Sequence, residues 1–331
     1  MKNATKTLVI LIILSFSCSR GPVVELSLLF HSDTPGWAHD ISLDETGIYI
    51  SDRHGGFLVF DKSLTLTRAA APVQDVISLS PNSGLPVLAS RFEGLALVSP
   101  SGSVTDRHTL GDIANAVEVR DGLAFAAYGV NGLVITRLAE GRALPVAALS
   151  TKGWSHDIRL SRDEALLADW QGLRIVDIHD PARPVEVAFL PSEATCISLA
   201  VKESGGKRLV ALAEGHGGVA LASLEAGERP VLLGRHYLGL NPADPAHPDS
   251  GGWVHSVAWA GRDVVAANWK RGLAILDAAD PRAPELLLEY PVPGTALGVK
   301  TQLQPDGSHL VFLAGGESGF WAFRLVRKAG A

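Results

Sequence analysis

A glycine that follows a short turn and opens an apolar run recurs seven times along this chain of 331 residues. The seven glycines are Gly56, Gly94, Gly132, Gly172, Gly218, Gly272 and Gly319, and successive copies lie 38, 38, 40, 46, 54 and 47 residues apart. A unit of about 40 residues with four short strands is the period of a propeller blade. Glycine suits the turn because positive φ costs it little. The spacing predicts an all-β, seven-bladed β-propeller, with residues 22–331 as one domain.

The fourth copy shows how one unit divides into strands. Residues 155–160, 165–169, 173–178 and 185–190 are four short runs rich in apolar side chains, and the prolines of residues 180–184 fix a turn before the last run. The first three runs are largely apolar, as expected where both faces of a blade pack on neighbouring blades. The pattern predicts four-stranded blades, with strands a to d named in chain order.

The two ends of the chain together complete one unit. The last copy runs out after a third strand at residues 320–325, and residues 22–30 form an apolar strand with no unit of their own. Pairing these two segments removes an exposed sheet edge. We therefore expect the N-terminal strand to supply strand d of the last blade and close the ring.

Residues 172–184, which read Gly-Leu-Arg-Ile-Val-Asp-Ile-His-Asp-Pro-Ala-Arg-Pro, resemble the LVIVD repeat of bacterial and archaeal surface proteins. Residues 272–284 are a second good match, whereas the other five copies keep the glycine and strand but lose the Asp-Pro turn. The resemblance spans residues 22–326 and implies a seven-bladed propeller. It implies little about activity, because such repeats are a scaffold motif.

The N-terminus has the features of an export signal. Two lysines precede an apolar run over residues 8–14, which is too short to span a bilayer as a helix. Cys18 follows a small residue, which resembles the lipobox of bacterial lipoproteins, although the Ser and Phe further upstream depart from that motif. We expect residues 1–17 to be a lipoprotein signal peptide and residues 18–21 a short segment anchored through a lipid on Cys18; the alternative is an ordinary secretory signal with an incidental cysteine.

Charge and cysteine content limit the partners. The formal net charge is −6 and no basic block is present, so nucleic acid is not an expected partner. The one other cysteine, Cys196, lies in an apolar run and is predicted to be a small buried residue rather than a nucleophile. We expect an exported monomer attached to a membrane by its lipid anchor, at the outer membrane, on its periplasmic side or at the cell surface.

The stretch Gly-Trp-x-His occurs at residues 36–39, 153–156 and 252–255, where it opens strand a of blades one, four and six. In a propeller the start of strand a shares a face with the turn between strands b and c. Side chains of both segments should therefore meet near one mouth of the channel. The predicted binding residues are Trp37, His39, Asp52, His54, Trp154, His156, Asp169, Trp170, Trp253, His255, Asn268 and Trp269.

Three interpretations of the repeated histidines remain open. They can be architectural, each satisfying a neighbouring backbone or carboxylate group. They can line a site for a protein, glycan or small molecule, with the tryptophans as aromatic walls. They can also form a three-histidine metal site of His39, His156 and His255. The other four blades carry Gln74, Asn115, Thr195 and Leu297 at the place assigned to these histidines, so a blade does not require histidine there.

Recognisable catalytic motifs are absent. The sequence contains no Gly-x-Ser-x-Gly, phosphate loop, paired CxxC or HExxH. Asp40 and Asp157 adjoin two of the histidines, but strand alternation is expected to point them the opposite way. A binding or interaction scaffold with its site on the Gly-Trp-x-His face is the favoured function. The alternative is a periplasmic enzyme or metal-binding protein at the same mouth, with no cofactor indicated.

Overall fold

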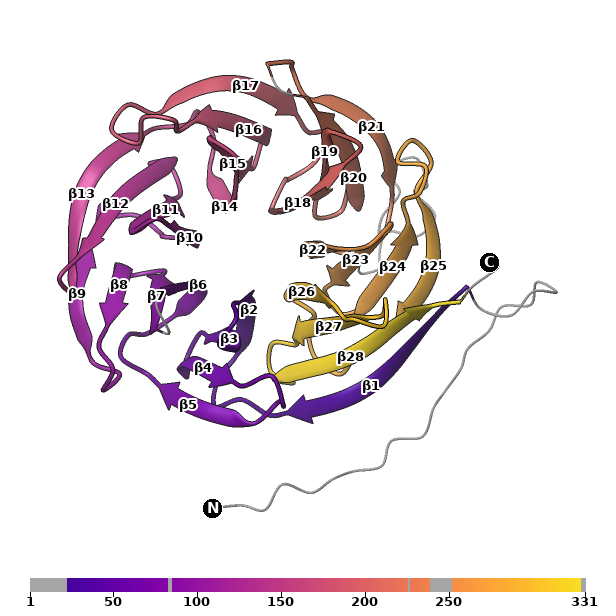
Figure 1. Ribbon diagram of the computed structural model, residues 1–331, viewed down its shortest axis with the longest axis horizontal. Coiled ribbons are helices and arrows are strands. Elements are labelled where there is room, and N and C mark those ends of the chain that lie inside the picture. The colour runs from indigo at the N-terminus through magenta and orange to yellow at the C-terminus, as the bar shows by residue number, and fades with distance from the viewer. Residues whose placement is uncertain (1–22, 83–84, 226, 239–251, 329–331) are drawn as a thin grey trace.

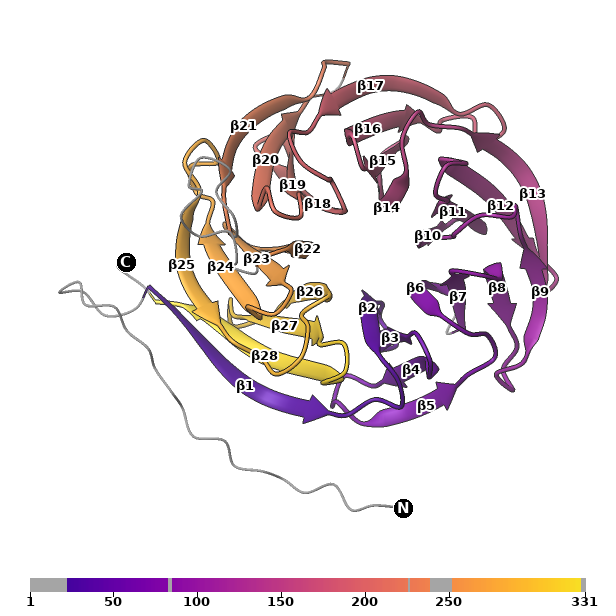
Figure 2. The same cartoon turned by 180° about the vertical axis from the view of Figure 1, so that it is seen from behind.

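Seven four-stranded antiparallel sheets surround a central channel (Figure 1). The computed structural model describes residues 23–82, 85–225, 227–238 and 252–328, and Figure 2 shows the same ring from behind. The predicted seven-bladed propeller with four-stranded blades is confirmed. The predicted signal peptide and lipidated Cys18 lie outside the described residues. Among those residues, no helix has the length and apolar character needed to cross a membrane.

The strands follow one another from the channel outward in each blade. Blades one and two contain β2 (Ala38–Leu43), β3 (Ile48–Asp52), β4 (Gly56–Phe60) and β5 (Leu66–Ala70), then β6 (Val76–Asn82), β7 (Leu85–Ser90), β8 (Gly94–Val98) and β9 (Val104–His108). Blades three and four contain β10 (Ala116–Arg120), β11 (Leu123–Ala127), β12 (Leu133–Ala139) and β13 (Arg142–Leu149), then β14 (Ser155–Ser161), β15 (Glu164–Asp169), β16 (Gly172–Asp177) and β17 (Val185–Pro191).

The remaining blades repeat this order. Blades five and six contain β18 (Ser198–Ser204), β19 (Lys207–Ala213), β20 (Val219–Leu224) and β21 (Val231–His236), then β22 (Val254–Ala260), β23 (Asp263–Asn268), β24 (Leu273–Asp277) and β25 (Glu285–Tyr290). Blade seven contains β26 (Gly298–Leu303), β27 (His309–Ala314), β28 (Phe320–Arg327) and β1 (Val24–Ser32).

Strand β1 closes the ring. It pairs antiparallel with β28, from Val24 opposite Arg327 to Ser32 opposite Phe320, so the first strand of the chain is the outermost strand of the last blade (Figure 1). The expected closure is confirmed, with the strand two residues further along than predicted. Because β1 covers one edge of β28, both ends of the described chain are held in a single sheet.

The apolar core lies between blades rather than at the centre of the ring. Strands β3, β4 and β8 are buried at every position because both faces of the middle strands contact a neighbouring sheet. Tyr49 and Phe57 of blade one, for example, pack with Leu88 of blade two, and each fully buried side chain of this kind stabilises the fold by about 1.5–3 kcal/mol. Cys196 is fully buried, as predicted. Burial raises the pKa of its thiol and makes the thiolate scarce.

Candidate functional site at the channel mouth

The tryptophan of each Gly-Trp-x-His stretch lies at the joint with the preceding blade. Backbone bridges join Ala38 to Gly316, Ser155 to Gly129 and Val254 to Gly215, each across a joint between blades. A side chain on Gly316 would collide with the Trp37 indole, and one on Gly215 would crowd the Trp253 ring. These tryptophans therefore need a glycine on the preceding blade.

The glycine partner explains which blades carry the motif. The residue at this turn position is Gly129, Gly215 or Gly316 in blades three, five and seven, and each has positive φ. The blades that follow them are four, six and one, the three that carry Gly-Trp-x-His. The other blades have Arg53, Arg91, Trp170 and Trp269 at this turn position, and the blades after those lack the motif. The Gly-Trp half of the motif is thus an inter-blade packing unit.

The first residues of these turns are buried and support the same segments. Asp52 is fully buried, and its carboxylate accepts hydrogen bonds from the backbone N–H groups of Gly36 and Trp37 at 2.9 and 2.7 Å. Asp169 is fully buried beside the Arg174 guanidinium, with 3.2 Å between Oδ2 and Nε. Asn268 is also fully buried and donates to the Leu238 carbonyl at 2.8 Å. In this structure the three side chains hold the turns.

Replacing the glycine under Trp253 tests this packing. Gly215→Ala is expected to destabilise the fold by about 1–2 kcal/mol for left-handed backbone strain, and further because ring atoms of Trp253 lie 3.1–3.2 Å from the new methyl. Gly205→Ala is the matched control, since Gly205 has a similar φ of 58° but nothing within 4 Å of its added Cβ. Urea denaturation measures both; equal losses would show that the Trp253 contact contributes nothing.

A β-bulge turns the second half of each motif toward the channel. Strand register shifts between Ala38 and Asp40, between Ser155 and Asp157, and between Val254 and Ser256, so the histidine between each pair is the extra residue. Because a bulge breaks strict alternation, the histidine and the residue after it both line the channel. The expectation that Asp40 and Asp157 point away from their histidines is therefore wrong.

Strand register also identifies the equivalent positions in the other blades. Blade two has the same bulge between Val76 and Ser78, which places Ile77 there instead of Gln74. In blade five the residue before Ser198, which pairs with Ala213, is Ile197 instead of Thr195. Asn115 and Leu297 hold the position in blades three and seven, as assigned from the sequence. One ring around the mouth thus contains three histidines, one asparagine and three aliphatic residues.

The channel-facing half of the motif contacts the following blade. His39 Nδ1 lies 2.8 Å from the Ile77 carbonyl oxygen and His255 Nδ1 lies 3.2 Å from that of Leu297. A carbonyl only accepts, so both Nδ1 atoms donate, and each Nε2 of the neutral ring keeps a free lone pair. One layer deeper, Ser78 Oγ donates to Asp40 at 2.8 Å and Ser198 Oγ donates to Asp157 at 2.7 Å. Each motif therefore fastens its blade to both neighbours.

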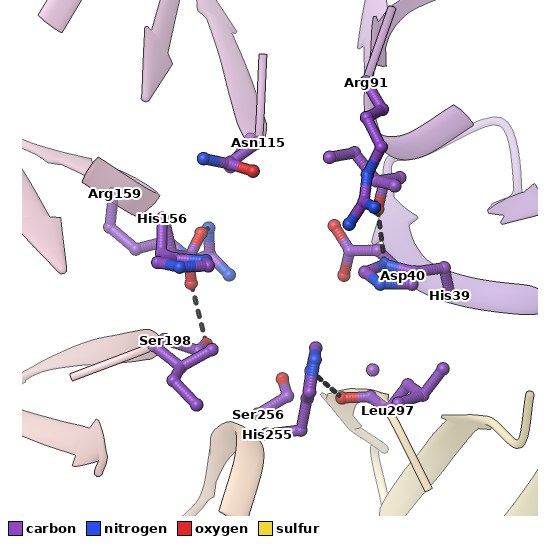
Figure 3. Close-up of a pocket in the computed structure, with 15 residues that line it drawn as sticks. His39, Asp40, Arg91, Asn115, His156, Arg159, Ser198, His255, Ser256 and Leu297 are labelled. Atoms are coloured by element: carbon purple, nitrogen blue, oxygen red, sulfur yellow. Dashed lines mark hydrogen bonds and ion pairs between the residues drawn. The ribbon is translucent and has the colours of Figure 1, made fainter. Parts of the chain in front are cut away.

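A polar cavity of about 140 Å³ occupies the mouth. Figure 3 shows the imidazoles of His39, His156 and His255 on three sides of the opening, with Asn115 and Arg91 completing the rim. The remaining lining residues are Asp40, Ile77, Ala116, Asp157, Arg159, Ile197, Ser198, Ser256, Leu297 and Gly298.

The imidazoles are neutral near pH 7. Burial, followed by the nearby His255 ring, lowers the pKa of His39 to about 3 and that of His156 to about 4. Burial also lowers the pKa of His255, opposed by its bond to Leu297 and by the carboxylates of Asp40 and Asp157. The mouth thus presents uncharged nitrogen acceptors.

Charged groups lie close to the cavity floor. Burial works to raise the pKa of Asp157, but Arg159, 2.7 Å away, and Lys300 outweigh it and lower that pKa. Burial and the charge of Arg159 lower the pKa of Lys300, whereas burial raises the pKa of Glu118 against the pull of Arg159. Opposite charges are thus interleaved around this part of the channel, which limits the desolvation cost of each.

The structure brings three of the twelve predicted binding residues together at the cavity. These are His39, His156 and His255. The others do not line it and lie around or beneath the mouth; they are Trp37, Asp52, His54, Trp154, Asp169, Trp170, Trp253, Asn268 and Trp269. Sequence reasoning missed the second channel-facing layer, including Asp40, Asp157 and Ser198, because the bulge has no recognised sequence signal.

The three histidines differ in their surroundings. The rings of His39 and His255 are nearly perpendicular, with centroids 5.4 Å apart, whereas His156 stacks on Trp170 at 5.5 Å. His156 Nε2 is buried without a hydrogen-bond partner. Within the ranges that the structure describes, no group of three or more His, Cys, Asp or Glu side chains comes close enough to hold a metal ion. The arrangement therefore does not support a three-histidine metal centre.

Comparison with known proteins adds a repeat family to the fold. The family model of the LVIVD repeat matches residues 152–189, which cover blade four except the last two residues of β17. The chain is a seven-bladed β-propeller that carries an LVIVD repeat. No curated protein matches the sequence of this propeller.

Solved structures share the fold of this propeller at low sequence identity. The β-propeller domain of Myceliophteria thermophila Cps50 (Swd1) is 14% identical, with a TM-score of 0.68 over 91% of this chain and 99% of that one. The WD40 β-propeller domain of Doa1 is 11% identical, with a TM-score of 0.66 over 92% and 98% of the two chains. The computationally designed Ika8 protein is also 11% identical, with a TM-score of 0.61 over 90% and 99%. These similarities establish the architecture alone.

Proposed function

We propose that this propeller is an exported, lipid-anchored binding scaffold of the cell envelope, and that its ligand site is the channel mouth on the Gly-Trp-x-His face. The observation that carries the proposal is the concentration of hydrogen-bonding groups around a cavity of about 140 Å³. Neutral imidazoles, an amide and a guanidinium surround an opening that the other blades line with Ile77, Ile197 and Leu297. A small polar molecule, or one polar group of a larger partner, fits this size and chemistry.

The hydrogen bonds at the mouth favour binding over acid–base catalysis. His39 and His255 donate to backbone carbonyls, and the hydroxyls of Ser78 and Ser198 donate to carboxylates. In the described part of the channel, none of the hydrogen bonds joins an imidazole to a serine or a carboxylate, as an activated nucleophile requires. The groups are instead fixed by the joints between blades, which suits a preorganised recognition site.

The topology supports an outward-facing mouth. Strand a begins at the mouth, so strand d runs toward it, and β1 therefore starts near the opposite face and ends beside the mouth at Ser32. His31 confirms this direction, because its Nε2 lies 2.8 Å from the Ser318 carbonyl in the b–c turn of blade seven. A lipid on Cys18 would precede β1 by residues 19–23, a tether of at most about 20 Å. The anchor would thus hold the opposite face toward the membrane and leave the mouth accessible.

The anchor is tested by one substitution. Cys18→Ala is expected to move the protein from the membrane fraction to the soluble fraction, because the apolar run of residues 8–14 is removed with the signal peptide. Cell fractionation and intact-mass measurement of the mature chain give the readout. Cys196→Ala, at the other cysteine of the chain, should stay membrane-bound and acylated. A Cys18→Ala protein that remains in the membrane, together with a mature wild type that carries no acyl chain, would contradict the lipid anchor.

The ligand site at the mouth is tested by replacing one imidazole with a ring that has no nitrogen. His156→Phe keeps an aromatic ring against Trp170 but deletes both hydrogen-bonding atoms. We expect it to abolish the thermal stabilisation that binders from a panel of small polar metabolites and short glycans give the wild type. His179→Phe is the matched control, because the His179 side chain is 83% exposed in a turn after strand c. If every binder stabilises both variants equally, the ligand site lies elsewhere.

A further inference from the structure

We infer that His39 and His255 together bind one divalent transition-metal ion at the channel mouth, an inference that goes beyond the proposed function because it assigns a second kind of ligand to this face. The two side chains come from blades one and six, which the ring brings together beside blade seven (Figure 3). They contribute through Nε2, and solvent supplies the remaining ligands. This pair replaces the set of three histidines expected from the repeated motif.

The orientation of both rings is that of prepared metal ligands. Ligating histidines almost always donate their second ring N–H to a carbonyl or carboxylate, which fixes the tautomer and raises the basicity of the coordinating nitrogen. His39 makes this bond to Ile77 and His255 makes it to Leu297, each across a joint between blades. The Nε2 lone pairs are thus fixed by rigid backbone, and neutral imidazole is the form that binds copper, nickel and zinc.

The separation of the rings suits one shared ion. Two imidazoles that bind an ion through nitrogens at about 2.0–2.1 Å in near-tetrahedral geometry place their ring centroids about 5 Å apart. The His39 and His255 centroids are 5.4 Å apart and the ring planes are nearly perpendicular at 86°. Two unprotonated imidazoles at this distance cannot satisfy each other with a hydrogen bond, because each Nε2 is an acceptor. An ion between them satisfies both lone pairs.

His156 lies outside this pair and supplies the control. It carries the same motif, but none of the carbonyls in the described part of the chain accepts a hydrogen bond from its Nδ1, and its ring stacks on Trp170 instead of meeting another imidazole. Its buried Nε2 has no partner, yet no group of three ligands forms among the described residues. Only two of the three repeated histidines should therefore affect metal affinity.

Asparagine provides the sharpest test, because the propeller already uses it at this position. Asn115 is equivalent to the histidines and donates across its joint to the Ser155 carbonyl at 2.8 Å. His39→Asn and His255→Asn can therefore keep a donor at the joint while losing the coordinating Nε2. The full-length chain without an affinity tag is titrated calorimetrically with Zn²⁺ and with Cu²⁺, and thermal melts check that each variant is folded. Electron paramagnetic resonance of the Cu²⁺ complex reports coordinating nitrogens.

We expect one ion to bind tightly per chain, with a higher affinity for Cu²⁺ than for Zn²⁺. Each of His39→Asn and His255→Asn should weaken it at least tenfold, and the nitrogen signature of two imidazoles should be lost. His156→Asn should bind as the wild type does. The inference is overturned if both ring variants bind metal normally or if His156→Asn loses as much affinity. Because His156→Phe tests small-molecule binding separately, failure of the metal site would leave the proposed function standing, and the reverse also holds.

Discussion

A chain that begins at residue 33 is expected to lose cooperative unfolding, whereas one that begins at residue 22 should keep it. The longer chain retains β1, which covers the edge of β28 and buries Val24 and Leu26. Removing β1 exposes the edge of β28 and the apolar cluster of Trp321, Phe323 and Leu325, at a cost of several kcal/mol. A loss of that size is comparable with the whole stability of a domain. Circular dichroism melts and size-exclusion chromatography distinguish the two chains.

A synthetic peptide of residues 22–32 extends this test. Added to the chain that begins at residue 33, it should restore a cooperative transition in a concentration-dependent way, because it supplies the missing strand d. If the shorter chain is already monomeric with the same melting temperature as the longer one, strand β1 does not hold the ring closed.

Acidification from pH 7 to pH 4.5 is expected to destabilise the propeller by roughly 3–5 kcal/mol through His39 and His156 alone. Their folded-state pKa values, about 3 and about 4, lie below the ordinary value of 6.5. The unfolded chain therefore binds more protons than the folded chain below pH 6.5. The stability that neutral imidazoles confer is complete above that pH and is lost as the pH falls. Burial raises the pKa of Glu118 and Glu214, whose protonation in acid opposes part of this loss.

The free energy of unfolding in urea at several pH values measures this effect. A His39→Asn, His156→Asn double variant should show a shallower dependence between pH 6.5 and pH 4.5, since two titrating groups are gone. His179→Asn removes a solvent-exposed histidine and should leave the wild-type slope unchanged. An unchanged slope in the double variant would mean that these imidazoles do not titrate below their ordinary range.

The fold could be predicted from the sequence because each blade needs a glycine at the same turn. Gly132, Gly172 and their equivalents occupy turns of positive φ, and each is followed by a strand buried on both faces, so spacing and apolar runs indicate the same unit. Closure of the ring could also be predicted, because the last unit lacks a fourth strand and the N-terminal segment supplies one. The boundaries moved by only one or two residues, as strand ends do.

The site could be predicted only in part, because the orientation of its side chains depends on a β-bulge, one extra residue in the innermost strand of the blade. A bulge at His39 changes neither composition nor turn signals, yet it turns Asp40 into the channel. Arg91 was not predicted as a cavity-lining residue, because blade two lacks the Gly-Trp-x-His motif. It occupies the turn position that holds a glycine in blades three, five and seven. The role of the tryptophans was visible in principle. Gly129, Gly215 and Gly316 precede the three Trp-bearing blades, and only the geometry of the joint shows why.

The three Gly-Trp-x-His segments contact both neighbouring blades and so serve six of the seven joints of the ring, which leaves the joint between blades two and three without one. That joint is held instead by an apolar core shared by the two blades, which includes Val87, Leu95 and Val117, and by the Val119 N–H, which donates to Ser80 Oγ at 3.0 Å between the innermost strands. At the periphery, the Ala143 N–H donates to Asp106 at 2.9 Å. Near the mouth, the facing residues Ile77 and Asn115 carry no mutual hydrogen bond in the described structure, because Asn115 bonds to blade four instead. Loss of one motif would thus weaken two neighbouring joints at once, whereas the joint between blades two and three depends on its own apolar core.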